Sequence, residues 1–510
     1  MKLCSSAQMR EIDRHVIEDL GVPGAMLMSN AAAHIAAAAL EGLSPGGRAA
    51  VLCGTGNNGG DGIGAAAFMI DKGIHVRVFL LGSEERLTPD SREMLQRLTA
   101  SGGKIEKFCE SGEIEGYLSR CDVIIDAIFG TGLNSDLRGD ALPAVKMMNS
   151  SGARIIAADI PSGVSADTGL IMGDSVNADI TVTFSLAKPG HFIEPGCTRR
   201  GELRISDIGI PDDILDSVDS GVFAVMPEDI ALKPRRLDTH KGDYGRCLVA
   251  AGSVGYSGAP AFCARAASKM GAGLVFLGVP DQIYGIMATK LDEEMPFPLP
   301  GDTNGRLAAN AAGELIRRAE GCDAFLIGPG LGRSDEISEM VASLIRIIRT
   351  PIILDADGLF AISDNVDVLG KAVCPMILTP HLGEFSRLTG GAPYTDRLSA
   401  ARGFAVENRC TLVLKGHRTI TALPDGTAFI NVTGGPAMAK GGSGDVLAGM
   451  ITALIGQRYT IKDAALIAVY LHGLAGDMCA AEYGEYSVTA GDIIAMLPKA
   501  IMKLGERAES

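Results

Sequence analysis

Residues 49–62 read AAVLCGTGNNGGDG and decide the fold of the first half of the chain. The apolar run Ala49–Cys53 predicts a buried β-strand, and the residues after the turn predict a helix. Three glycines of the turn, Gly54, Gly56 and Gly59, match the G-x-G-x-x-G pattern. In this strand-to-helix context, the first N–H groups of the helix can bind phosphate. The pattern alone would also fit a dinucleotide-binding dehydrogenase.

Apolar strand patterns alternate with helical patterns on both sides of this stretch. Such alternation predicts a parallel sheet covered on both faces, with ligands at the carboxyl ends of its strands. An N-terminal helix is also predicted, because Ser5 and Gln8 have capping-box spacing. The expected strands of the first half are Ala49–Cys53, Val76–Leu81, Val123–Ile128, Arg154–Ala158 and Ile180–Ser185.

Polar side chains follow three of the predicted strands. Asp126 closes one strand, and Asp159 and Ser162 follow another. Because the carboxyl ends of parallel strands share one edge, we expect Asn58, Asp126 and Ser162 to converge as hard oxygen ligands for a cation. Taken singly, Asp126 or Asp159 would more often cap a turn or helix. Their occurrence together favours a site.

The alternation of strand and helix patterns stops between Ile210 and Gly245, where the sequence is polar, acidic and rich in turn residues. Such a stretch is typical of a domain connection, and we place the boundary near residue 220. The α/β pattern then restarts, which divides the 510 residues into domains 1–215 and 224–510. The expected strands of the second half are Cys247–Ala251, Leu274–Val279, Ala324–Ile327, Ile352–Asp355, Met376–Thr379 and Thr411–Lys415.

A second phosphate site is predicted at residues 431–449, NVTGGPAMAKGGSGDVLAG. Val446, Met450 and Leu454 recur at helical spacing, so Gly441–Gly444 would present N–H groups at the start of a helix. Asp445 could then act as the base for a hydroxyl that attacks phosphorus. The alternative is an acidic residue that only complements the helix dipole.

Composition and charge narrow the class of protein. The net charge is −15, so long-range attraction to nucleic acid or an anionic membrane is not expected. Residues 1–20 contain no apolar signal region and no run of 18 uncharged apolar residues occurs, so we expect a cytoplasmic protein that does not span a membrane. The 11 cysteines contain no C-x-x-C pair and are expected to be mostly buried and reduced.

The motifs CGTGNNGGDG, IDAIFGTGL and ADIPSGV resemble those of the NAD(P)H-hydrate epimerase domain, over residues 1–215. The resemblance implies a Rossmann-like three-layer αβα domain and a potassium ion held by Asn58, Asp126 and Ser162. We favour Asp159 as the acid/base group. Lys188 is the weaker candidate, and its alternative role is only to cap the end of a strand. The hydrated nucleotide would be held by Asn57, Asn58, Gly59, Gly60, Asp61, Gly130, Thr131, Gly132, Leu133, Asn134, Ser135, Asp136 and Asp159.

Residues 224–510 resemble the ribokinase-like superfamily, and within it the ADP- or ATP-dependent NAD(P)H-hydrate dehydratases. The glycine loops after the predicted strands, together with GGSGD, carry this resemblance. After Thr-Pro this chain has His381-x-x-Glu384, as the dehydratases do, where the vitamin kinases have Asn-x-x-Glu. Leu382 stands where the dehydratases usually have proline. The resemblance implies that Ala259, Gly332, His381 and Asp445 contact the hydrated nucleotide, with Asp445 as the base. The adenosine phosphate would be held by Lys415, Gly416, His417, Arg418, Thr419 and Gly444.

The two resemblances together imply a bifunctional repair enzyme. Its first half would interconvert the R and S forms of hydrated NADH and NADPH (NADHX and NADPHX), and its second half would dehydrate the S form with ADP. Glu384 would orient Mg²⁺, whereas Asp355 and Asp357 fit either a metal-bound water or a turn cap. A homo-oligomer is expected by resemblance, since relatives are often tetramers. A vitamin-precursor kinase with an accessory domain, or a non-enzymatic interaction module in the first half, is the alternative.

Overall fold

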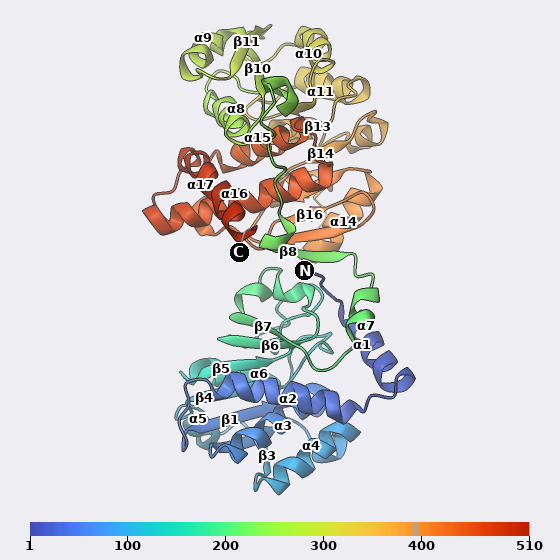
Figure 1. Cartoon of the computed structure of the whole chain (residues 1–510), viewed down its shortest axis with the longest axis vertical. Coiled ribbons are helices and arrows are strands. Elements are labelled where there is room, and N and C mark those ends of the chain that lie inside the picture. The colour runs from blue at the N-terminus through green and yellow to red at the C-terminus, as the bar shows by residue number, and fades with distance from the viewer. Residues whose placement is uncertain (392–394, 509–510) are drawn as a thin grey trace. The chain divides into compact units, whose positions relative to one another are not determined.

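The computed structural model describes residues 1–391 and 395–508, which separate into two compact units. One unit is Lys2–Val222, and the other contains Met1 and Phe223–Ser510. Each unit is an α/β domain with its own sheet (Figure 1). The expected α/β fold class, with a Rossmann-like first domain and a ribokinase-like second domain, is therefore confirmed.

The first unit contains a seven-stranded sheet in the order β3-β2-β1-β4-β5-β6-β7, and all neighbouring strands run parallel. Its strands are β1 (Arg48–Cys53), β2 (His75–Leu80), β3 (Ile105–Lys107), β4 (Val123–Ala127), β5 (Arg154–Ala158), β6 (Ile180–Phe184) and β7 (Glu202–Ser206). Its helices are α1 (Ser6–Arg14), α2 (Gly24–Leu40), α3 (Asn57–Asp71), α4 (Pro89–Ala100), α5 (Gly112–Leu118), α6 (Ala141–Ser150) and α7 (Asp212–Ser217).

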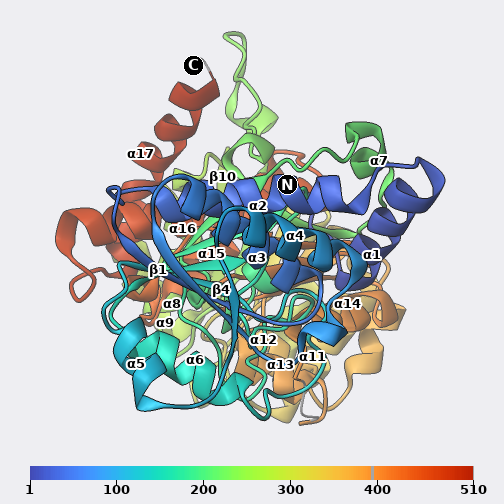
Figure 2. The ribbon, with the colours of Figure 1, turned by 90° about the horizontal axis from the view of Figure 1, so that it is seen from below.

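Apolar side chains from α2, α3 and α4 pack on one face of this sheet, where the three helices lie side by side (Figure 2). The other face packs against α5 and α6, so the unit has three layers. This arrangement explains why β4 is buried along its whole length and is apolar except for Asp126 near its carboxyl end. The N-terminal helix α1 begins at the predicted capping box of Ser5 and Gln8.

The second unit contains a ten-stranded sheet in the order β11-β10-β9-β12-β13-β14-β15-β16-β17-β8. Its strands are β8 (Val222–Val225), β9 (Arg246–Ala250), β10 (Leu274–Pro280), β11 (Met295–Leu299), β12 (Ala324–Ile327), β13 (Ile352–Leu354), β14 (Met376–Leu378), β15 (Thr411–Leu414), β16 (Ile420–Ala422) and β17 (Ala428–Asn431). The strands from β11 to β15 pair in parallel, whereas β16 pairs antiparallel with both β15 and β17.

Ten helices belong to the described part of this unit. They are α8 (Gly258–Lys269), α9 (Asp281–Lys290), α10 (Ala312–Ala319), α11 (Asp335–Ile347), α12 (Asp357–Ala361), α13 (Leu382–Leu388), α14 (Arg397–Glu407), α15 (Ser443–Gly456), α16 (Ile461–Tyr483) and α17 (Ala490–Ala508). The main core lies between the sheet and the helices α8, α15, α16 and α17. By length and composition α16 could cross a membrane, but 72% of its most apolar window is buried inside the unit, as in the core helix of a folded domain.

Eight of the 11 cysteines are buried, and all of them are free thiols, as expected for core residues. Burial raises the pKa of Cys53 to about 12, so this thiol stays protonated at neutral pH.

Candidate functional sites

The first unit holds a cavity of about 620 Å³ at the carboxyl ends of its parallel strands. Of the residues predicted to hold the hydrated nucleotide, Asn57, Asn58, Asp61, Gly130–Leu133 and Asp159 line it. The remaining predicted residues, Gly59, Gly60, Asn134, Ser135 and Asp136, are not among the residues that line the cavity. Side chains that the sequence did not single out also line it, among them Asp13 and Arg10 of α1 and Phe129.

Two glycines of the loop after β1 serve the packing of the backbone. A Cβ on Gly54 would lie 2.2 Å from the carbonyl oxygen of Ile128, and one on Gly59 would lie 1.9 Å from the carbonyl oxygen of Gly54. No side chain fits at either distance. By contrast, a Cβ on Gly56 would meet nothing within 4 Å. The glycines therefore bring the start of α3 against the end of β4, which places Asn57 and Asn58 in the cavity.

Two of the three residues predicted to hold a cation, Asp126 and Ser162, contact each other, and the third, Asn58, lies by the loop after β4, since a Cβ on Gly130 would be 3.1 Å from Asn58 Oδ1. Ser162 Oγ donates to Asp126 Oδ1 at 2.6 Å, and the Ser162 backbone N–H donates to Asp126 Oδ2 at 2.7 Å. Phe129 N–H donates to Ser162 Oγ at 2.9 Å. Both polar atoms of the Asn58 side chain are buried without a hydrogen-bond partner. Asn58 Oδ1 therefore provides an available oxygen beside this loop, and amide, carboxylate and hydroxyl oxygens form a donor set that fits a hard monovalent cation.

Asp159 and Lys188 form a buried ion pair, with 2.5 Å between Asp159 Oδ1 and Lys188 Nζ. Thr183 Oγ1 donates to the same carboxylate oxygen at 3.0 Å. Burial acts to raise the pKa of Asp159, but the charge and hydrogen bond of Lys188 outweigh it and lower the pKa. Asp159 also has a φ of 65°, a sparsely populated conformation that aspartate adopts more readily than most non-glycine residues. The weaker candidate Lys188 thus belongs to the same site as Asp159.

Two further carboxyl groups share this cavity. Asp61 is buried, and its pKa is raised well above its usual value by burial and by the charges of Asp159 and Asp13. Burial also raises the pKa of Asp13 to about 6. Sequence reasoning missed Asp13, although it follows the buried Ile12 in the helical pattern of α1. A polar side chain at this position lies at the edge of the buried face of α1 and can therefore reach the cavity.

In the second unit, the predicted anion site lies at the start of α15. Gly442 precedes the helix with a φ of +92°, which favours glycine, and Ser443 is the first helical residue. Ser443 Oγ lies 3.2 Å from Nε2 of the buried His472. Burial and the charge of Asp355 raise the pKa of Asp445 to about 7. Asp445 is therefore a carboxyl group suited to proton transfer near neutral pH.

A second ion pair, between the partly exposed Lys415 and the buried Asp355, lies beside this helix start. Lys415 Nζ is 2.7 Å from Asp355 Oδ1, and a Cβ on Gly444 would lie 3.1 Å from the same Nζ. Burial acts to lower the pKa of Lys415, but the charges of Asp355 and Glu384 outweigh it and raise the pKa. The ammonium group thus stays charged next to the N–H groups of α15, an arrangement suited to a phosphate group.

The roles of Asp355 and Asp357, which the sequence left open, differ. Asp355 pairs with Lys415, whereas Asp357 accepts hydrogen bonds from the Gly332 N–H at 3.0 Å and from Arg333 Nε at 2.9 Å. Asp357 therefore holds the loop of the predicted substrate residue Gly332.

His381 caps α13, since its Nδ1 accepts from the N–H of Gly383 at 3.0 Å. In return, the His381 N–H donates to Glu384 Oε2 at 2.8 Å. His381 is 60% exposed, which leaves its ring available to a ligand. Residues Gly416–Thr419 form the turn between β15 and β16, and Ala259 lies in the first turn of α8.

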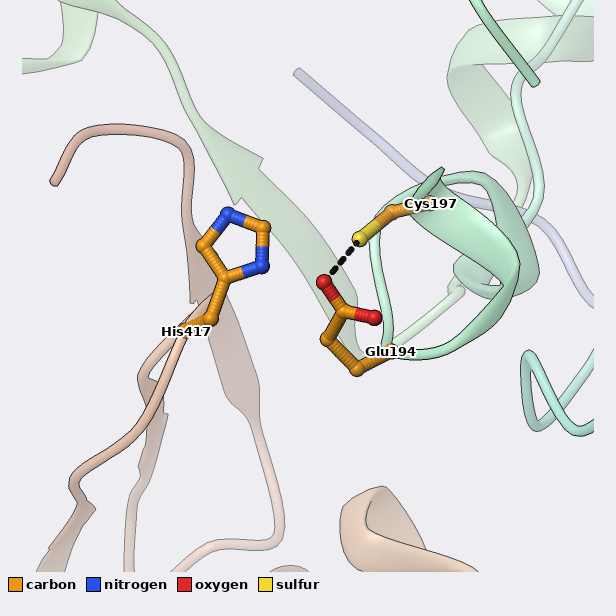
Figure 3. Close-up of side chains that lie close together, drawn as sticks. All are labelled: Glu194, Cys197 and His417. Atoms are coloured by element: carbon orange, nitrogen blue, oxygen red, sulfur yellow. Dashed lines mark hydrogen bonds between the residues drawn. The ribbon is translucent and has the colours of Figure 1, made fainter. Parts of the chain in front are cut away.

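A pair outside the cavity of the first unit is drawn in Figure 3. Cys197 Sγ donates to Glu194 Oε1 at 3.3 Å. Neither residue lines the cavity, and we assign neither a role in the site.

Comparisons with known proteins agree with the two-site organisation. Residues 24–190 match the family described as YjeF-related protein N-terminus, and residues 247–499 match the family described as NAD(P)H-hydrate dehydratase. The bifunctional NAD(P)H-hydrate repair enzyme of Thermofilum pendens is 39% identical, over 100% of this chain and 98% of the relative. This chain belongs to the family of bifunctional NAD(P)H-hydrate repair enzymes.

Other similar proteins carry related names. The bifunctional NAD(P)H-hydrate repair enzyme of Moorella thermoacetica is 38% identical, over 100% of this chain and 98% of the relative. A solved structure of the ADP/ATP-dependent NAD(P)H-hydrate dehydratase from Bacillus subtilis, co-crystallised with ATP and Mg²⁺, is 30% identical with a TM-score of 0.48. The match covers 56% of this chain and 99% of the Bacillus subtilis chain. The family resemblance predicted from the motifs is confirmed, and the repair-enzyme family is favoured over the vitamin-kinase alternative.

Proposed function

We propose that the first unit interconverts the R and S forms of NADHX and NADPHX. The second unit converts the S form to NADH or NADPH, with ADP becoming AMP and phosphate. Family membership supports the pair of activities. The observation that carries the chemistry is the position of Asp445 on the first turn of α15, in the same site as the charged Lys415.

In the epimerase site, residues 57–61 and 130–136 and Asp159 would hold the hydrated nucleotide. The loops contribute backbone N–H groups and small side chains, which suit an anionic ligand in a protein of negative net charge. Asp159 and Lys188 together form the acid/base group, in which the Lys188 ammonium donates a proton to the hydroxyl that leaves and Asp159 stabilises the ammonium.

Asn58, Asp126 and Ser162 would hold K⁺ beside this site. The unpartnered Asn58 amide supports the assignment. The ion would supply a fixed positive charge in a site for an anionic substrate. Epimerisation is therefore expected to be faster in potassium than in sodium salts at equal ionic strength, and Asn58→Ala should abolish the difference.

In the dehydratase site, Ala259, Gly332, His381 and Asp445 would contact the hydrated nucleotide. Residues 415–419 and Gly444 would hold the phosphates of ADP, and Glu384 would orient Mg²⁺ and its waters. Bound Mg²⁺ would neutralise phosphate charge. The short distance between Gly444 and Lys415 Nζ supports a phosphate at this position.

Asp445 starts the dehydration. Its carboxylate takes the proton from the hydroxyl of the hydrate as the hydroxyl oxygen bonds to the terminal phosphorus of ADP, and AMP leaves. The phosphate ester then loses phosphate, and the neighbouring ring carbon loses a proton as the ring double bond forms. Phosphate is a better leaving group than water, so ADP consumption drives the elimination.

Product analysis by mass spectrometry tests both activities. The full chain with ADP should consume an equal mixture of R and S hydrate completely, after correction for spontaneous epimerisation. Consumption of only half would contradict the epimerase. The same assay with ATP in place of ADP decides the phosphoryl donor. Asp445→Ala should stop dehydration, and a variant that retains it would overturn the assignment of the base.

We further propose that the protein acts in the cytoplasm and as a homo-oligomer, a tetramer being the form expected by resemblance. Analytical ultracentrifugation at micromolar concentration tests the oligomer, and a dilute monomer with full activity would contradict it. Cell fractionation tests the location.

A further inference from the structure

The epimerase reaction requires proton transfer on two faces of one carbon. This carbon carries a hydroxyl and is bonded to the ring nitrogen. To invert it, the C–O bond breaks with its electron pair on oxygen, a proton joins that oxygen, and water leaves while the nitrogen lone pair forms C=N. Water then adds to the opposite face, loses a proton to a base, and the C=N electron pair returns to nitrogen. Proton-transfer groups are needed on both faces.

The Asp159–Lys188 pair can serve only one of these faces. Lys188 is 2% exposed and contacts both Asp159 and Thr183, so its position is fixed. A second group must lie in the same cavity, come from a different element and be able to change its protonation state. Asp13 meets these requirements because it lies on α1 and lines the cavity.

The segment that carries Asp13 is anchored to the segment that carries Lys188. Cys4 N–H donates to the carbonyl oxygen of Ala187 at 2.9 Å, directly before α1. The Ser6 N–H donates to Asp167 Oδ1 at 2.7 Å, which fixes the first turn of the helix. These contacts hold α1 beside the site, so Asp13 occupies a defined position in the cavity wall.

We propose that Asp13 is a second proton-transfer residue of the epimerase: it accepts the proton of the water that adds to the ring carbon and donates a proton to the leaving hydroxyl in the reverse direction. This inference rests on the proposed epimerase function. Nothing in the sequence motifs assigns a role to Asp13, and its carboxyl group gives the site a proton acceptor outside the buried ion pair.

The electrostatic surroundings suit this role. Burial raises the pKa of Asp13 to about 6, with Lys188 acting to lower the pKa and Asp159 to raise it. Asp13 is therefore mostly ionised at pH 7 and can accept a proton. Its pKa is also close enough to neutral for the protonated form to donate the proton in the reverse reaction. The other charged groups that line the cavity are Arg10 of α1, Asp61 of α3, Asp90 of α4, and Asp159 and Lys188.

The test uses the full chain with pure R or pure S hydrate and without ADP, so that only epimerisation is measured, by chromatography. Asp13→Asn should lower kcat/KM at least about 100-fold in both directions. The wild-type rate should rise with pH through about 6, as Asp13 loses its proton, and the variant should lack this inflection. Asp13→Glu, which keeps the carboxyl group, should recover at least about tenfold over Asp13→Asn.

Two controls isolate the effect. Dehydration of pure S hydrate with ADP should stay within about twofold of wild type, because it uses the other unit. Glu11→Gln, an exposed change on the same helix, should leave epimerisation within about twofold. The proposal is overturned if Asp13→Asn epimerises within about threefold of wild type, retains the inflection near pH 6, or is matched by an equally slow Asp13→Glu. A wild-type chain without epimerase activity would instead contradict the proposed function.

Discussion

Both units pair one lysine with one buried aspartate at the carboxyl ends of parallel strands, but they surround these pairs differently. Lys188 is 2% exposed and its pair is enclosed by Thr183 and the cavity wall. Lys415 is 18% exposed and lies beside Gly444 at the start of α15. The first arrangement suits proton transfer in a sheltered cavity, whereas the second offers a cation and N–H groups to an incoming phosphate. The comparison shows how similar sheet edges can support different reactions.

The largest expected effect is the loss of the proposed base in the second unit. Asp445→Asn should lower kcat for dehydration by about 10²–10⁴-fold, because it removes general-base catalysis. Epimerisation should not change. NADH formation from pure S hydrate measures the first rate, and chromatography of the epimers measures the second. Asp364→Asn, an exposed change in the same unit, is the matched control. A parallel loss of both activities would show that the units are not independent.

The next effect concerns the stability of the enclosed pair. Lys188→Met should destabilise the first unit by about 3–5 kcal/mol at neutral pH, because it leaves the Asp159 carboxylate buried without its cation. Since the pKa of Asp159 is lowered in the folded wild type, the pair stabilises the fold above the unfolded pKa. This contribution is lost as the pH falls through the folded pKa, so the variant should approach wild type below about pH 4.

Hydrogen exchange of β4–β6 followed by mass spectrometry measures this local stability. The exposed Lys146→Met should change it by less than about 0.5 kcal/mol. A Lys188→Met deficit that stays constant from pH 7 to pH 3 would mean that lost packing, and not the unpaired charge, causes the destabilisation.

A smaller effect should appear in the pH dependence of dehydration. Asp445 must be ionised to act as a base, so kcat/KM should rise with pH through about 7 in the wild type. Asp355→Asn removes a neighbouring negative charge and leaves Lys415 without its partner, and both changes should lower the pKa of Asp445. The inflection should then move to about pH 6 or below. Asp364→Asn should leave it in place, and an unmoved inflection in Asp355→Asn would exclude Asp445 as the titrating group.

The sequence predicts the parallel strands in the interior of both sheets well, because their buried positions form apolar runs. It misses β3, β7 and β11, which lie at sheet edges and contain charged or proline residues. It also misses the antiparallel strands β16 and β17, whose short runs resemble the loops around them. Edge strands bury less apolar surface, so their pattern is weak.

The sequence likewise predicts the site residues that belong to a local pattern and misses those that do not. The motifs identify residues at strand ends and helix starts, such as Asn58, Asp126 and Asp445, because the glycine and polar residues at these positions form local sequence patterns. They do not identify Asp13, which reaches the cavity from a helix far away in sequence. The ion pairs of Lys188 and Lys415 are also absent from any local pattern, since each partner lies on a different strand end.

The smallest effect tests whether α1 belongs to the first site or only packs beside it. Ser5 and Gln8 form a reciprocal capping box, in which Ser5 N–H donates to Gln8 Oε1 at 2.9 Å. Ser5→Ala should cost about 1 kcal/mol of local stability. Ser334 caps α11 in the second unit by accepting from the Ile337 N–H at 3.3 Å, so Ser334→Ala should cost a similar amount.

The two capping variants should differ in activity even though they lose similar stability. Because α1 carries Asp13, a looser helix start should slow epimerisation by about two- to fivefold. Ser334→Ala should leave epimerisation unchanged, since α11 belongs to the second unit. Equal epimerase rates in the two variants, measured without ADP at the same fraction of folded protein, would show that α1 is a structural helix and that the first site relies on its strand ends alone.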